Sequence, residues 1–190
     1  MIPMQQEIQK EPKKIHPQKF AMWIAIGSII MMFGGFTSGF IVRKSQGNWL
    51  HYKIPVEFII STIVVILSSV TMHLAVKSFK SRKMTFHKNM VTLTLLLGLA
   101  FVVLQFLGFK DLYAQFAWNN NVSLQFITVI VLVHALHIAG GMVALIILFL
   151  RTFARRVKVY SATGIEIVAL YWHFVDILWL YLFVFFLLNQ

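Results

Sequence analysis

Apolar positions along the chain gather into five long runs that are separated by short polar segments. The runs cover residues 20–42, 55–76, 90–109, 122–150 and 165–188. Each run reaches the ~20 residues that a helix needs to cross a hydrocarbon core ~30 Å thick. In lipid, a chain of this kind satisfies its backbone polar groups only as a helix. The pattern predicts an all-α membrane bundle of five transmembrane helices over residues 20–190, preceded by a polar, basic tail over residues 1–19.

The composition excludes a soluble domain. Hydrophobic residues make up 59% of the 190 positions and charged residues 12%, whereas soluble domains have roughly 45–50% and about 25%. Cysteine is absent, which excludes disulfides, thiolate metal sites and iron–sulfur clusters. The six acidic residues leave little material for a carboxylate-rich metal site.

The basic residues predict an orientation. Of the 17 lysines and arginines, 13 lie in the tail and in the segments 77–88 and 151–158, on one side of the predicted membrane. Cytoplasmic segments carry such an excess, so we expect the N-terminus inside and the C-terminus outside. The net charge of +11 then marks contact with anionic lipid, and no groove-reading motif accompanies it that would indicate nucleic acid.

A few ionisable side chains fall inside the apolar runs, where they are costly and need partners. They are Glu57, His73, His134, His137, Glu166, His173 and Asp176. Residues three apart share a helix face, which pairs His134 with His137 and His173 with Asp176. Glu166 is near the inner end of the last run. There it can meet lipid headgroups or a loop arginine, or it can be a first-turn carboxylate favoured by the helix dipole.

Two interpretations of the histidine pairs stay open on the residues alone. In the first, a histidine from each of the two helices holds a b-type haem, and Gly140 and Gly141 provide space for the ring. In the second, the groups are structural, with His173 bonded to Asp176 within a turn or either of them bonded across helices. A transporter is disfavoured because no proline interrupts a run and no inverted repeat is visible.

Small and hydroxyl residues predict close helix packing. Gly35 and Gly39 form a G-x-x-x-G pair in the first run. The second run carries Ser61, Ser68, Ser69 and Thr71, whose spacing indicates contacts with other helices.

The last run also carries a family resemblance. The stretch Tyr171-Trp-His-Phe-Val-Asp176, followed by Trp179, resembles the last helix of cytochrome c oxidase subunit III. The stretch His134-Ala-Leu-His137-Ile-Ala-Gly-Gly141 is similar to the preceding helix of that family. The resemblance extends over the second to fifth runs, and the helix number is similar to that of the short five-helix form of bacterial oxidases.

The resemblance implies a subunit with no catalytic, cofactor or metal site of its own, with haem and copper held by partner subunits I and II. Such a subunit packs on the catalytic subunit in the bacterial cytoplasmic membrane, holds structural phospholipid and supports proton uptake. Under this reading the structural polar contacts are His73, His134, His137, His173 and Asp176. From charge and depth, we expect lipid headgroups at Arg151, Arg155, Arg156 and Glu166. Subunits of quinol oxidases and proteins associated with nitric oxide reductase share the fold, so the electron donor stays open.

Overall fold

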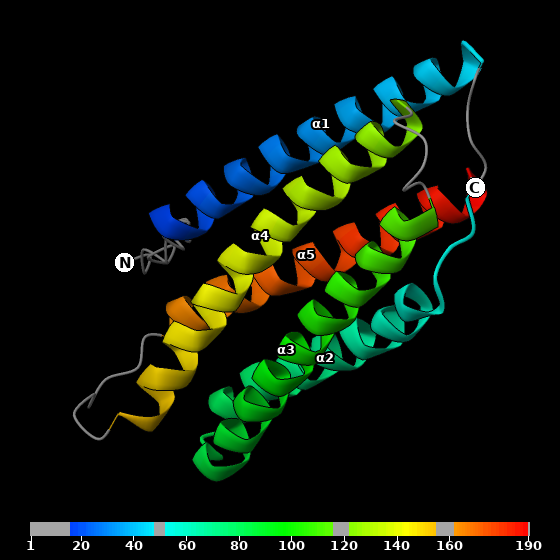
Figure 1. Cartoon of the computed structure of the whole chain (residues 1–190). Helices are drawn as coiled ribbons and strands as arrows, with labels where there is room; N and C mark the ends of the chain where they lie inside the picture. Colours follow the sequence, from blue (N-terminus) through cyan, green and yellow to red (C-terminus); the bar gives the residue numbers. More distant parts are fainter. Residues whose placement is uncertain (1–15, 48–51, 116–121, 155–161, 190) are drawn as a thin grey trace, which may run out of the picture.

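The computed structural model describes residues 16–47, 52–115, 122–154 and 162–189. These ranges form five helices (Figure 1): α1 (Pro17–Ser45), α2 (Val56–Lys80), α3 (Met84–Gln115), α4 (Val122–Phe153) and α5 (Ala162–Leu188). All five are long and apolar enough to cross a membrane. The prediction of an all-α chain with five candidate spans is therefore confirmed.

The helices extend beyond the apolar runs that predicted them. α3 begins at Met84 and ends at Gln115, six residues outside the predicted run at each end, because backbone hydrogen bonds continue where the hydrocarbon stops. α1 begins at Pro17, which suits the first turn because its missing N–H needs no partner there. The predicted tail is therefore helical from residue 17, and residues 1–15 lie outside the described ranges.

Helix α5 is the centre of the bundle. It packs against α1, α2 and α4, while α2 and α3 form an antiparallel hairpin. Figure 1 shows α5 between the α1–α4 pair and the α2–α3 pair. Within the described ranges α1 contacts only α4 and α5. Helix α5, together with α4, therefore joins α1 to the α2–α3 hairpin.

A tight turn connects α2 to α3. Arg82 has a φ of 57°, a left-handed conformation that costs a non-glycine residue ~1–2 kcal/mol. Its N–H donates to the Phe79 carbonyl at 3.0 Å, and the Lys83 N–H donates to the Ser78 carbonyl at 3.0 Å. This is a Schellman C-cap, which satisfies the last carbonyls of α2 and turns the chain at once into α3.

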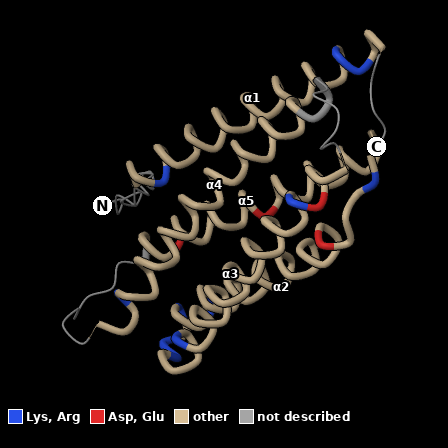
Figure 2. The backbone as a smooth tube through the Cα atoms, in the orientation of Figure 1, with Lys and Arg blue, Asp and Glu red and all other residues tan. Residues whose placement is uncertain are grey.

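Charged residues concentrate at the two ends of the bundle (Figure 2). We call one of them the basic end, formed by the start of α1, the α2–α3 turn and the end of α4. Its described cations are Lys19, Lys77, Lys80, Arg82, Lys83, Lys88 and Arg151.

Candidate functional site

Hydroxyl groups of α2 hold the buried tryptophans of α5. Trp172 and Trp179, each at most 2% exposed, lie seven residues apart on one face of α5. The Trp172 Nε1–H donates to Ser68 Oγ at 3.0 Å, and the Trp179 Nε1–H donates to Thr62 Oγ1 at 3.1 Å. These two bonds fix the register of α5 along α2.

The same hydroxyl-rich helix also bonds to α3. The Gln105 Nε2–H donates to Ser61 Oγ at 2.9 Å, and the hydroxyls of Thr71 and Thr94 are 2.9 Å apart. The prediction that the serines and threonines of the second run contact other helices is confirmed. Helix α2 therefore forms side-chain hydrogen bonds with both of its neighbours, α3 and α5.

His173 bonds to a serine of α2, and Asp176 lies three residues further along α5. His173 Nδ1 is 2.6 Å from Ser69 Oγ. Asp176 is 3% exposed, and its Oδ2 has no hydrogen-bond partner among the described residues. The exposed His73 has its ring centroid 6.5 Å from that of His173. His173 is thus linked to α2 through Ser69.

His134 and His137 lie on the α4 side and make no such link. The His134 ring stacks on Trp179, with centroids 5.5 Å apart, and neither of its nitrogens has a hydrogen-bond partner among the described residues. His137 Nδ1 bonds the Val133 carbonyl of its own helix at 2.7 Å. Both rings also pack against Phe33 on α1 in T-shaped arrangements. The cross-helix hydrogen bonds to His173 or Asp176 are not formed.

The space predicted for a haem ring is filled by aromatic side chains of α5. A Cβ at Gly141 would be 3.1 Å from Trp172, and a Cβ at Gly140 would be 3.5 Å from the Tyr171 hydroxyl. That hydroxyl donates to the His137 carbonyl at 3.1 Å. The two glycines therefore admit α5 itself, and the residues around them do not fit a haem. Within the described ranges no three His, Asp or Glu side chains group as metal ligands.

Glu166 joins three helices at the basic end. Its carboxylate forms an ion pair with Lys19 of α1 and a second with Lys80 of α2 at 2.7 Å. The sequence indicated a loop arginine as one partner, but Arg155 and Arg156 lie outside the described residues. Both lysines come from parts of the chain that sequence spacing does not connect to residue 166. Arg151, the fourth predicted lipid contact, is in the last turn of α4.

Comparison with known proteins identifies the family of this bundle. A family model described as cytochrome c oxidase subunit III matches residues 50–189, which is most of the chain. The chain belongs to the cytochrome c oxidase subunit III family. The match contains α2 to α5 in full, including the Trp172, His173 and Asp176 contacts of α5. Membership makes the chain a subunit of a haem–copper terminal oxidase.

Subunit III relatives of two kinds are similar to the chain. Probable cytochrome c oxidase subunit 3 of Mycobacterium tuberculosis strain H37Rv is 29% identical over 189 residues, covering 90% of each chain. The same figures hold for the protein of that name from Mycobacterium bovis. Probable quinol oxidase subunit 3 of Staphylococcus aureus strain USA300 is 27% identical over 173 residues, covering 87% of this chain and 85% of the relative.

Proposed function

We propose that the chain is the non-redox subunit III of a bacterial cytochrome c oxidase, with no catalytic centre of its own. The family match over residues 50–189 carries this proposal. The internal chemistry supports it, because His173 and the two buried tryptophans of α5 each bond to a hydroxyl group of α2. Groups used in this way hold the bundle together. Oxygen reduction would then occur at haem and copper in partner subunits.

Two exposed features support packing on a catalytic subunit. His73 is exposed although it is inside the apolar span of α2, and an imidazole in contact with lipid chains is costly. On α1, a Cβ at the exposed Gly34 or Gly35 would meet nothing within 4 Å. Small residues on an open helix face allow another helix to approach closely. A protein partner at these faces would remove the His73 imidazole from lipid and would pack closely on the small residues of α1.

The membrane placement follows from the charges. The basic end faces the cytoplasm under the positive-inside rule, which puts the end of α5 outside. At that cytoplasmic rim we place structural phospholipid, with Arg151, Arg155, Arg156 and Glu166 as headgroup contacts. Through these contacts and its packing, the subunit would support proton uptake by the catalytic subunit.

A quinol oxidase is the second candidate, and the Staphylococcus aureus relatives favour it. The electron donor of the oxidase can be identified from the oxygen consumption of the purified complex. Reduced cytochrome c should support turnover under the first proposal, and a quinol alone should support it under the second.

Co-purification tests the function itself. A tagged chain extracted from native membranes in mild detergent should bring down a catalytic subunit with haem and copper, identified by mass spectrometry and by the reduced-minus-oxidised spectrum. The chain separated from that complex should show no Soret band. A monodisperse chain without an oxidase core would refute the proposal, and a stoichiometric Soret band on the isolated chain would revive the cytochrome interpretation. The complex depleted of this chain should lose activity faster during repeated turnover.

The Glu166 ion pairs give a charge-swap prediction. Glu166→Lys places three ammonium groups in contact and should loosen α1 and α2 from α5 at the basic end. Exposed ion pairs contribute only ~0.2–1 kcal/mol each, so we expect a modest loss of thermal stability in the assembled complex. Adding Lys19→Glu to the same chain should recover part of that loss. If the double variant is no more stable than Glu166→Lys alone, the Lys19–Glu166 pair does not stabilise the bundle.

A further inference from the structure

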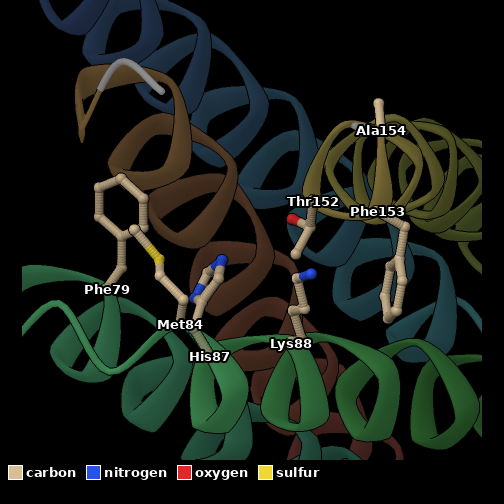
Figure 3. Close-up of a pocket in the computed structure, with 7 residues that line it drawn as sticks. All are labelled: Phe79, Met84, His87, Lys88, Thr152, Phe153 and Ala154. Atoms are coloured by element: carbon tan, nitrogen blue, oxygen red, sulfur yellow. The ribbon is translucent and has the colours of Figure 1, made fainter. Parts of the chain in front are cut away.

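Two cavities open where α3 meets α4, and they differ in how their polar side chains are used. The one at the basic end (Figure 3) has a volume of about 210 Å³. Its His87 Nδ1 is 2.8 Å from the Ala75 carbonyl, and its Lys88 Nζ lies 5.5 Å from the centroid of the Phe153 ring. The Thr152 hydroxyl donates to a carbonyl one turn earlier on α4. Each of these side chains is already engaged within the chain.

The second cavity lies further along the same two helices, inside the membrane span. It is lined by α3 residues between Leu99 and Phe109 and by α4 residues between Val131 and Met142. Its volume of about 440 Å³ falls in the ~300–1,000 Å³ range of small-molecule sites. The lining side chains include no lysine, arginine, aspartate or glutamate, and two of them are polar. A ligand that matches such walls is uncharged and mostly apolar.

His134 is the first polar residue of this cavity, and its imidazole lacks hydrogen bonds. The side chain is 1% exposed, and neither ring nitrogen has a partner among the described residues. A neutral imidazole has one N–H donor and one acceptor, and a buried polar group without a bond is costly. Stacking on Trp179 holds the ring in this position. A polar atom of a ligand in the cavity would supply a missing bond.

Gln105 is the second polar residue, and it faces the cavity from α3 at the depth of His134. A Cβ at Gly98 would be 3.0 Å from Met142 Sδ, which gives the register of the two helices. Gln105 is seven residues after Gly98, and Ala135 is seven residues before Met142. Since seven residues are about two turns on either helix, Gln105 lies opposite Ala135 and its neighbour His134.

Gln105 still has hydrogen-bonding capacity. It donates one N–H to Ser61 Oγ at 2.9 Å, and a primary amide has a second N–H and a carbonyl oxygen besides. The residue is four positions inside the end of the apolar run of residues 90–109, a distance of ~6 Å along the helix. The polar groups of a phospholipid lie outside the hydrocarbon core. A ligand that bonds to both residues must therefore carry its polar atoms into the hydrocarbon.

We propose that this cavity binds the ring of an isoprenoid quinone or quinol. Such a ring is planar and uncharged, and its two oxygens accept hydrogen bonds in the quinone and also donate them in the quinol. Gln105 and His134 bond to the ring oxygens, while Phe106 and Phe109 pack on the ring. The tail leaves past Leu99, which is 55% exposed. The site goes beyond the proposed function, because it involves no electron transfer in this chain and does not depend on the donor of the oxidase.

Photolabelling in native membranes tests the site. Membranes that contain the tagged chain are treated with an azido-substituted isoprenoid benzoquinone and illuminated, and the labelled peptides of the purified chain are mapped by mass spectrometry. The label should fall within residues 99–109 and 131–142. An excess of the unsubstituted quinone should suppress it, and an equal excess of oleic acid should not.

Variants separate the polar pair from the shape of the cavity. Gln105→Leu should lower labelling about fivefold, the factor that one net hydrogen bond contributes. His134→Phe keeps a ring against Trp179 but removes both nitrogens, and it should lower labelling by a similar factor. Ala139→Phe fills the cavity from its exposed rim and should abolish labelling. Ala100→Phe is the matched control, because Ala100 is an exposed alanine of α3 that does not line the cavity.

Three results would overturn the proposal. Suppression by oleic acid as strong as that by quinone would mean that an acyl chain fills the cavity. Labelling unchanged by both Gln105→Leu and His134→Phe would mean that the polar pair binds nothing, and absence of label from both segments would mean that a partner covers them. The oxidase core is scored in the same preparation. Its loss contradicts the proposed function, whereas a chain that keeps its core but takes no label contradicts only this site.

Discussion

Trp179→Ala is expected to destabilise the bundle by about 3–5 kcal/mol, the usual cost of truncating a buried tryptophan. Trp179 is 1% exposed, and four helices meet at its ring. It contacts Phe58 of α2 and Phe101 of α3 at centroid distances of 5.5 and 5.7 Å, and it stacks on His134 of α4. The variant leaves a cavity at this junction and removes the bond to Thr62.

This effect is measured by thermal denaturation of the assembled oxidase, with the loss of the co-purifying chain as the signal. The control is Trp23→Ala, because Trp23 of α1 is 59% exposed and its removal leaves no internal cavity. Trp179→Phe should lie between the two, since it keeps an aromatic ring but loses the hydrogen bond. Similar midpoints for Trp179→Ala and Trp23→Ala would show that the ring does not anchor the four helices.

Gly98→Val is expected to separate α3 from the α4–α5 pair. A Cβ at Gly98 would be 3.0 Å from both Met142 Sδ and Trp172 Cη2. Methionine can move aside, but Trp172 is held by its bond to Ser68. Overpacking of this kind costs about 1–3 kcal/mol, and here it should also weaken the α2–α5 contacts.

Gly27→Val is the matched control for this variant, because a Cβ at Gly27 meets nothing within 4 Å. Both variants carry the same β-branched residue in an apolar helix, so intrinsic helix propensity cancels in the comparison. The readout is the thermal midpoint of the assembled complex. A Gly98→Val complex as stable as the Gly27→Val complex would mean that Trp172 is not fixed in place.

The sequence predicted the helices well because the length and polarity of each run are local properties. It also predicted which α2 residues face other helices, since Ser61, Ser68 and Thr71 are buried. It did not predict their partners. The link from His173 to Ser69 spans 104 residues, and it depends on how α5 is rotated against α2, which no spacing along one helix specifies.

What the sequence left open has the same origin. Under one interpretation Gly140 and Gly141 provide space for a haem ring, and in the structure two aromatic side chains of α5 lie against them. For Glu166 the sequence left lipid headgroups, a loop arginine and the helix dipole open, and it did not indicate the ion pair with Lys19, which joins residues 147 apart. The sequence indicates that a small or charged residue inside an apolar helix contacts another part of the chain. Only the tertiary arrangement identifies that neighbour.

The central position of α5 has a consequence for biosynthesis. The ribosome makes this helix after the other four, and Ser68, Ser69 and Thr62 can bond to their α5 partners only once it has been made. Until then α1 has only α4 to hold it within the described part of the chain. The contacts among α1 to α4 therefore form without these bonds, and the bundle closes around α5 only after the other four helices have been inserted.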